Sequence, residues 1–419
     1  MRVTVVGGGS TYTPELVDGI GRLRDSLAVE ELVLVDPAAE RLELVAGVAR
    51  RILARQGHPA RVVATSDLDA GVADAQVVLL QLRVGGQAAR IGDETWPLDC
   101  GCLGQETTGA GGLAKAMRTV PVILDVAERV RRRAAPGAWI IDFTNPVGIV
   151  TRALLDDGHR AVGLCNVAIG LQRYFAQLLE VAPDRVQLDH VGLNHLTWER
   201  AVLVDGVDRL PELLDRHGAE IAEHLGLPVD VLTRLGSVPS YYLRYFYRHD
   251  LVVEEQRGGP TRGERVAEVE RELLEMYADE ALDEKPALLS ERGGAFYSEA
   301  AIDLMASLLH DRGDVQAVNV RNGSTFSFLA PEAVIEVSGR VDATGAAPLD
   351  LAPVEPLYAG LIAHVSAYEE LALEAAIKGG RDRVFRALLA HPLVGQSDLA
   401  DQLTDRLLAA NRQHLSWAR

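Results

Sequence analysis

The sequence contains very little cysteine, and it lacks the long hydrophobic runs of a membrane protein. Its three cysteines include Cys100 and Cys102, which lie two residues apart and are therefore too close for an ordinary disulfide bond. An odd cysteine count suits a reducing compartment. No run approaches the roughly 18 apolar residues that a membrane-spanning helix needs, and the opening MRVTVVGGGS has the pattern of a first strand rather than of a signal peptide. We therefore expect a cytoplasmic protein.

Positive charge is scarce as well, because 42 Lys and Arg residues face 60 Asp and Glu residues and the formal net charge is −18. This negative balance argues against nucleic acids and anionic membranes as partners. It is compatible with a small anionic substrate, because a few locally placed arginines can outweigh the global charge. At 419 residues, 48% of them apolar, the chain has the length and composition of a soluble protein with two domains or one large elaborated domain.

Short apolar segments alternate with helical patterns through the first 170 residues. Strands are predicted at 2–6, 31–37, 61–66, 75–82, 138–146 and 159–166. Helices are predicted at 14–27, 38–56 and 113–134. Strands that are apolar throughout and separated by helices are typical of a parallel sheet covered on both faces. The sequence therefore predicts an α/β fold with a Rossmann-like, doubly wound sheet, like that of lactate and malate dehydrogenases.

The pattern changes after residue 170. Antiparallel strands are predicted at 185–195 and 197–206, and further strands with turns within 316–345. Helices are predicted at 261–280, 294–312 and 355–392. We expect a Rossmann-like domain at 1–170 and an α+β lobe at 171–419 for substrate binding and oligomerisation, packed tightly together.

A glycine-rich turn, VVGGGSTYTPE, joins the first predicted strand to the first helix. Gly7 and Gly9 match the dinucleotide-binding pattern, whereas Tyr12 stands where its third glycine is usual. Such a turn lets the backbone approach a pyrophosphate, and the helix N-terminus supplies N–H donors. Asp36, at the end of the second strand, is placed to hold a ribose hydroxyl, which favours NAD over NADP. Further cofactor contacts are expected from Ser10, Thr11 and Arg83. The alternative is a purely structural turn with a helix cap.

Cys165 follows the apolar run AVGL, and His195 comes after a similar run in VGLNHLTW. Each is therefore expected at the carboxyl edge of a strand, where open α/β sheets bind their ligands. A thiolate and a neutral imidazole suit a borderline divalent metal such as Mn, Fe, Co, Ni or Zn. Two protein ligands leave most of the coordination shell open to substrate oxygens. The alternative is a buried free cysteine and a core histidine.

Many motifs occur together and in order along the chain. They are VVGGGSTYTPELV, LRVGGQAARIGDE, GQETTGAGGLAKAMRTVPV, DFTNPVGIVT, CNVAIG, VGLNHLTW, PSYYLRYFY and RGGAFYSEAAI. Over residues 1 to about 340 the sequence resembles glycoside hydrolase family 4, the NAD- and divalent-metal-dependent glycosidases, and most closely its 6-phospho-β-glucosidases. Most glycosidases use two carboxylates, and this family is an exception.

The resemblance implies a mechanism without net oxidation. NAD takes hydride from C3 of the sugar while a divalent metal, expected to be Mn²⁺, is held by Cys165, His195 and sugar hydroxyls. A tyrosine then removes the C2 proton, the aglycone on C1 leaves, water adds and the hydride returns. Tyr242 matches the family's base best, and Tyr241 is its competitor. Glu106 in GQETTG is either catalytic or a supporting loop residue.

The resemblance also implies how the sugar is recognised. Arg90 and Arg292 match family arginines near the 6-phosphate, and Asn145 and Asn166 are expected to add hydrogen bonds. Asn166 favours β-glycosides, because the α-specific members carry an aspartate after the cysteine and an amide cannot donate a proton as an acid does. Arginines would equally bind the sulfonate of sulfoquinovosides, so the substituent at C6 stays open.

Other activities compete with this interpretation. One is an α-glycosidase or sulfoquinovosidase of the same family type, and another is an NAD-dependent 2-hydroxyacid dehydrogenase. A third is a non-catalytic NAD sensor, which would explain the glycine turn but not the cysteine, histidine and tyrosine set. Family members are usually dimers or tetramers, so a homodimer or homotetramer is expected.

Overall fold

The computed structural model describes residues 1–294 and 296–418, and its centre is a sheet of 13 strands among these residues. Six strands are parallel and run in the order β3-β2-β1-β4-β5-β6. They are β1 (Arg2–Val6), β2 (Glu31–Val35), β3 (Arg61–Thr65), β4 (Val77–Leu80), β5 (Trp139–Asp142) and β6 (Ala161–Gly163). All six predicted strands are present, and this order confirms the Rossmann-like sheet.

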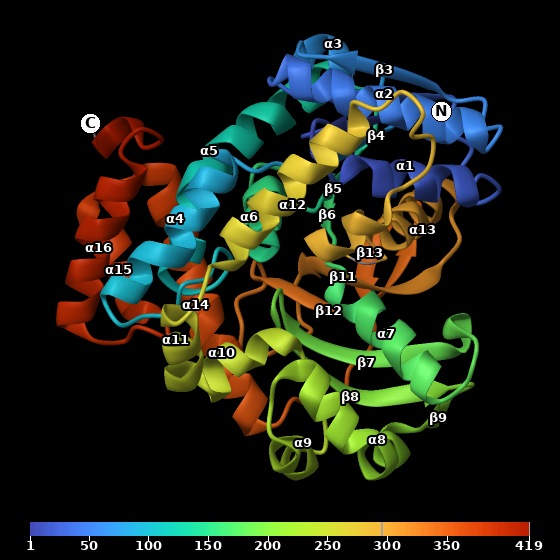
Figure 1. Ribbon diagram of the computed structural model, residues 1–419. Helices are drawn as coiled ribbons and strands as arrows, with labels where there is room; N and C mark the ends of the chain where they lie inside the picture. The colour runs from blue at the N-terminus through green and yellow to red at the C-terminus, as the bar shows by residue number, and fades with distance from the viewer. Residues whose placement is uncertain (295, 419) are drawn as a thin grey trace.

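Helices cover both faces of this parallel sheet, as the all-apolar strands require. β4 and β5 are buried at every position, so neither of their faces meets solvent. The helices of this part are α1 (Thr13–Arg22), α2 (Ala39–Arg55), α3 (Leu68–Val72), α4 (Gly86–Asp99), α5 (Gly109–Arg133) and α6 (Val147–Asp156). Figure 1 shows α1, α2 and α3 at the end of the molecule that carries the N-terminus.

The same sheet continues beyond residue 170 with antiparallel strands. β11 (Asp314–Arg321) pairs with β6, and the sheet then runs through β12 (Val334–Asp342), β7 (Val186–Leu193), β8 (Leu196–Val204) and β10 (Val238–Pro239). β13 (Gly345–Pro348) pairs with β12 and β9 (Val207–Asp208) with β8. The predicted antiparallel pair around residue 195 is therefore confirmed. The division at residue 170 stays a prediction, because β6 and β11 join the two parts of the chain.

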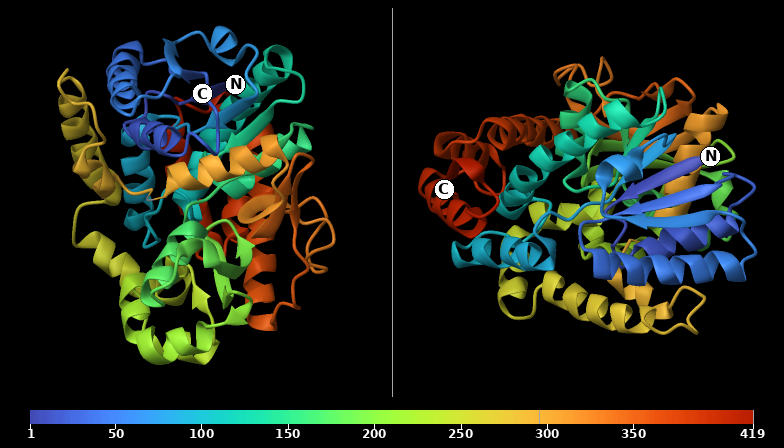
Figure 2. Two further views of the ribbon diagram at one scale, coloured as in Figure 1. Left: turned by 90° about the vertical axis from the view of Figure 1, so that its right-hand side faces the viewer. Right: turned by 90° about the horizontal axis from the view of Figure 1, so that it is seen from above.

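Six of the remaining helices form two groups of three. α7 (Val167–Leu178), α8 (Leu210–Leu225) and α9 (Val229–Leu235) lie beside β7, β8 and β10 (Figure 1). Three helices pack on α5, namely α14 (Pro356–Lys378), α15 (Arg381–Ala390) and α16 (Ser397–Asn411). The right-hand view of Figure 2 shows the red C-terminal helices at one side of the molecule. The others are α10 (Arg244–Tyr247), α11 (His249–Arg257), α12 (Arg262–Tyr277) and α13 (Tyr297–His310). Within the described ranges, no helix is long and apolar enough to cross a membrane.

The helices of the structure differ from the predicted ones at several points. The single helix predicted over 355–392 is two helices, because Gly379 and Gly380 take left-handed φ values of 64° and 98° and break the chain direction. α5 begins at Gly109, four residues before its predicted start. Its glycines are needed there for close packing, since a Cβ on Gly111 would lie 2.4 Å from the Asp93 carbonyl oxygen of α4. α4 itself was not predicted, because its glycines and Pro97 obscure the helical pattern.

Candidate active site

The glycine turn lies between β1 and β4, where the strand order of the parallel sheet reverses. Gly7 has a φ of 88°, and a Cβ there would lie 2.6 Å from the Gln81 carbonyl oxygen. The backbone N–H groups of Gly7 and Gly8 both donate to the Val35 carbonyl at 2.9 Å, which fixes the turn on β2. Dinucleotides bind to α/β sheets at such a reversal point.

Asp36 follows β2 and braces the turn. One carboxylate oxygen accepts from the Gly9 N–H at 3.1 Å, and the other from the Ala38 N–H at 3.0 Å. The side chain is only half-buried, and each carboxylate oxygen has a second lone pair for a ribose hydroxyl. The Ser10 hydroxyl accepts from the Tyr12 N–H at 3.2 Å, so Ser10 also lies within the turn.

Three cationic side chains gather around Glu106, which lies just before α5. Its carboxylate pairs with Lys115 at 2.6 Å, with Arg90 at 3.2 Å, and with Arg83. Burial opposes its ionisation, but Arg83, Lys115 and Arg90 outweigh it and hold the pKa of Glu106 well below the ordinary value. Glu106 is therefore an ionised anchor for three cations.

Arg292 brings a third arginine to the same region. Its guanidinium donates to Glu270 at 2.9 Å and to the buried Thr11 hydroxyl at 2.9 Å. Thr11 thus connects the glycine turn to the second half of the chain and does not face an open surface. Burial lowers the pKa of Arg292, and the nearby charges of Arg83 and Arg90 lower it further although Glu270 raises it. Three neighbouring guanidinium groups provide hydrogen-bond donors and positive charge suited to an anion.

Cys165 and His195 come from different parts of the sheet. Cys165 lies two residues beyond β6, and His195 is the second residue of the turn between β7 and β8, with a left-handed φ of 62°. His195 Nδ1 lies 3.0 Å from the Thr107 hydroxyl, which orients the ring and leaves Nε2 available. Burial lowers the pKa of His195 to about 4, so the imidazole is neutral at pH 7 and able to bind a metal.

The sulfur of Cys165 is buried in a polar setting. Burial and the neighbouring Glu336 raise the pKa of the thiol, whereas hydrogen bonds from the Val167 and Asn166 N–H groups and from the Asn194 amide lower it. A divalent cation would stabilise the thiolate. The described residues contain no group of three or more His, Cys, Asp or Glu side chains that could hold a metal. A thiolate and a neutral imidazole are donors that suit a borderline divalent metal, so the chemistry of Cys165 and His195 fits the predicted pair of ligands.

Tyr242 lies against this pair, whereas Tyr241 points elsewhere. The ring of Tyr242 stacks on His195 with centroids 3.7 Å apart and an angle of 8°. Burial raises the pKa of Tyr242, as does Cys165, and Arg90 lowers it. Tyr241 is 39% exposed, and its hydroxyl is 2.8 Å from that of Tyr245. Of the two predicted candidates, only Tyr242 contacts a predicted metal ligand among the described residues.

The two predicted asparagines lie at strand ends of the parallel sheet. Asn145 follows β5, and its buried side-chain oxygen has no hydrogen-bond partner among the described residues. A buried polar atom of this kind is unfavourable unless a ligand or water meets it. Asn166 is the residue before α7, next to Cys165. The sugar contacts expected of both asparagines stay a prediction.

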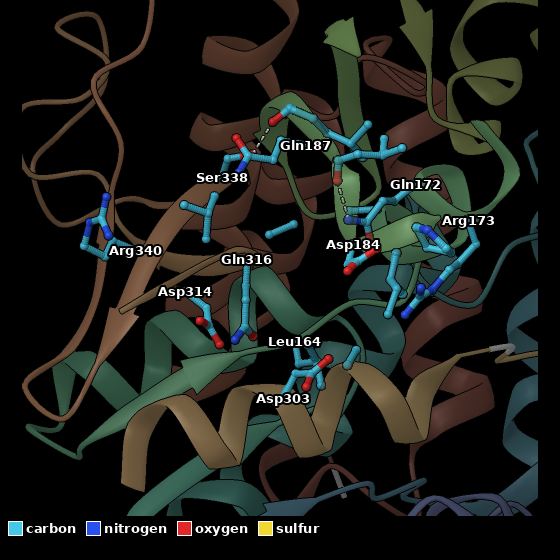
Figure 3. A pocket seen from close by; sticks show the side chains of 18 of the residues that line it. Leu164, Gln172, Arg173, Asp184, Gln187, Asp303, Asp314, Gln316, Ser338 and Arg340 are labelled. Atoms are coloured by element: carbon cyan, nitrogen blue, oxygen red, sulfur yellow. Dashed lines mark hydrogen bonds between the residues drawn. The ribbon is translucent and has the colours of Figure 1, made fainter. Parts of the chain in front are cut away.

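A cavity of about 600 Å³ borders Cys165 and lies between α7, α13 and the antiparallel strands (Figure 3). Its charged side chains largely neutralise one another, as Arg312 does with Asp314 at 2.8 Å and Asp303 at 3.6 Å. Of the predicted site residues within the described ranges, only Cys165 borders it. The cavity is therefore separate from the cluster of Tyr242, the arginines and Glu106.

Sequence reasoning missed several residues of the site. Lys115, Thr107, Asn194 and Glu336 all contact or electrostatically influence predicted site residues. Lys115 could have been found, because it is a single charge within the apolar face of a helix that begins GAGGLAKAM. The sequence gives no signal for Glu336, since only the pairing of β12 with β7 brings it near the predicted metal ligands.

The family models identify the chain. The family 4 glycosyl hydrolase model matches residues 2–181, and the model for the C-terminal domain of that family matches residues 190–394. The chain therefore belongs to family 4 of the glycosyl hydrolases. It is 37% identical to a probable 6-phospho-beta-glucosidase of Bacillus subtilis over 432 aligned positions, which cover 99% of this chain and 97% of that relative.

Solved structures agree with this membership. A 6-phospho-beta glucosidase of Thermotoga maritima, solved with manganese, NAD⁺ and glucose-6-phosphate, is similar with a TM-score of 0.91 and 30% identity over 99% of both chains. Malate dehydrogenase of Plasmodium falciparum shares the fold, with a TM-score of 0.55 and 13% identity over 90% of this chain and 99% of that one. This confirms the predicted fold class and the predicted family.

Proposed function

We propose that this protein hydrolyses 6-phospho-β-glucosides with bound NAD and a divalent metal, Mn²⁺. The observation that carries the proposal is the stacking of Tyr242 on His195, beside Cys165, in a chain of family 4. These three residues come from separate segments, so their meeting is a property of the fold. The B. subtilis and T. maritima relatives, named as 6-phospho-β-glucosidases, support the substrate class.

When bound, NAD supplies a reversible hydride acceptor and the metal supplies a Lewis acid for sugar oxygens. Cys165 and His195 would hold the metal, and the turn of Gly7 and Gly9 with Asp36 would hold NAD. Tyr242 would take the proton from C2 of the sugar. Arg90 is the cation of this chain that lowers the pKa of Tyr242 and so favours its phenolate.

The 6-phosphate is proposed to bind among Arg83, Arg90 and Arg292. The charges of Arg83 and Arg90 lower the pKa of Arg292, and Glu106 and Glu270 compensate only part of the positive charge of the three arginines. A dianionic phosphate would relieve the repulsion. In this arrangement Arg83, expected from the sequence to contact NAD, serves the substrate side as well.

Asn145 and Asn166 are proposed to orient the sugar hydroxyls. The unpartnered Asn145 oxygen can accept from a hydroxyl. Asn166, unlike an aspartate, cannot protonate a departing α-linked aglycone, and this supports β-glycosides. Glu106 is proposed to position the cations rather than to transfer protons, because its pKa is so low. The cytoplasmic location and a homodimeric or homotetrameric state are proposed from the sequence alone.

The test compares p-nitrophenyl β-glucoside 6-phosphate with the unphosphorylated β-glucoside, with NAD and Mn²⁺ present and each then omitted. Cleavage of the phosphorylated compound alone, and only with both cofactors, is expected. Cleavage of the α-linked phosphate or of the sulfoquinovoside instead would replace the anomer or the substituent in the proposal. Accumulation of one NADH per substrate consumed would indicate a dehydrogenase and overturn it.

A further inference from the structure

Behind Cys165 and His195 lies a buried network of four polar side chains that contain no metal ligand. His190 on β7, Glu199 on β8, Asn319 on β11 and Glu336 on β12 are each at most 1% exposed. His190 places its Nδ1 2.7 Å from Glu199 and its Nε2 3.0 Å from Glu336. Neighbouring strands bring these residues together, since His190 is paired with Glu199 and Asn319 with Glu336 in the strand register.

Glu336 connects this network to the metal pair. One of its oxygens accepts from the Asn194 amide at 2.8 Å and from the Asn319 amide at 2.8 Å. Asn194 is the other residue of the turn that carries His195, and its side chain lowers the pKa of the Cys165 thiol, as a neighbouring amide does. The side chain of Asn194 thus joins one buried carboxylate to the turn of one proposed metal ligand and acts on the other.

We propose that Glu336, fixed by His190, positions Cys165 and His195 for metal binding through the side chain of Asn194. This inference rests on the proposed function, because it assumes that the pair binds a metal. Glu336 and Asn194 are positioning residues, since neither belongs to the proposed ligand set. Partners that orient metal ligands in this way contribute roughly 10–100-fold to metal affinity.

The network offers two matched controls. Asn319 donates to the same Glu336 oxygen as Asn194 and over the same distance, but no hydrogen bond joins it to Cys165 among the described contacts. Glu199 contacts the other ring nitrogen of the same imidazole as Glu336, but among the described contacts it makes no hydrogen bond with Asn194. If the network served only to stabilise the fold, substitutions of Asn194 and Asn319 would change metal affinity equally, and so would substitutions of Glu336 and Glu199.

The experiment measures Mn²⁺ affinity of the full chain with NAD and without substrate, by the electron paramagnetic resonance signal of free Mn²⁺. Asn194→Ala is expected to weaken binding about 10–100-fold, and Asn319→Ala less than about threefold. Glu336→Gln should weaken Mn²⁺ binding as Asn194→Ala does, whereas Glu199→Gln should have as little effect as Asn319→Ala. Asn194→Ala leaves every buried charge in place, so it still tests the inference if Glu336→Gln does not fold.

The Co²⁺-loaded protein gives a second readout, the charge-transfer absorption of a cobalt–thiolate bond. This band should shift or weaken in Asn194→Ala and stay unchanged in Asn319→Ala, with Cys165→Ser as the reference without the bond. Equal affinity and equal bands in Asn194→Ala and the unmodified protein would overturn the inference while leaving the proposed function intact. An unmodified protein that binds neither ion would overturn both.

Discussion

Replacing Glu106 by glutamine separates its two proposed roles, as an anchor for cations or as a proton carrier. The substitution removes the charge that compensates Lys115, which is buried, and Arg90 and Arg83, which are partly buried. Breaking a buried ion pair by removing one partner costs about 3–5 kcal/mol. At about 2 °C per kcal/mol for a large domain, the expected fall in Tm is roughly 6–10 °C.

The kinetic effect should follow from the displaced arginines. In Glu106→Gln we expect KM for the 6-phosphorylated substrate to rise more than kcat falls, because Arg83 and Arg90 lose their common partner. Glu94→Gln is the matched control, since Glu94 pairs with Arg90 alone among these three cations. Thermal unfolding and initial rates measure both effects. An unchanged Tm with kcat reduced a thousandfold would refute the anchor role and make Glu106 the proton carrier.

Three further results are expected. Tyr242→Phe should lower kcat about 10²–10⁴-fold and abolish deuterium exchange at C2, whereas Tyr241→Phe should keep kcat within tenfold; equal losses would contradict the assignment. Arg90→Ala should raise KM for the phosphorylated substrate at least tenfold with NAD affinity unchanged, measured by NAD titration. Burial lowers the pKa of His391 to about 3, so its contribution to stability is lost as pH falls from about 6.5 toward 3. Between pH 7.5 and 5 the free energy of unfolding, measured in urea, should fall by about 2 kcal/mol more for the unmodified protein than for His391→Asn. Parallel pH profiles of the two proteins would exclude this effect.

The parallel half of the fold could be predicted from the sequence because each of its strands is apolar on both faces and separated from the next by a helix. The pairing of β6 with β11 could not, because strand order in an antiparallel extension depends on contacts between residues about 150 positions apart. The same limit applies to Glu336 on β12, which lies near Cys165 because β12 pairs with β11 and β7.

The motifs singled out Cys165, His195 and Tyr242 as site residues without any information on their positions in space. The structure brings the three side chains together. Thr11 shows what motifs cannot tell: it lies in the glycine turn, yet its hydroxyl is occupied by Arg292 and Glu270. Whether a side chain in a binding loop faces the ligand or the protein depends on which distant segment packs over it. No pattern within the loop contains that information.

The continuous sheet has a practical consequence for anyone who wishes to divide the chain. A fragment that ends where the first family model does, at residue 181, would leave β6 as an open edge without β11. It would also lose His195 and Glu336, whose carboxylate accepts from Asn194 in the same turn. Exposed strand edges promote association between chains. Shortened versions should therefore aggregate, and the cofactor half of this enzyme is best studied within the whole protein.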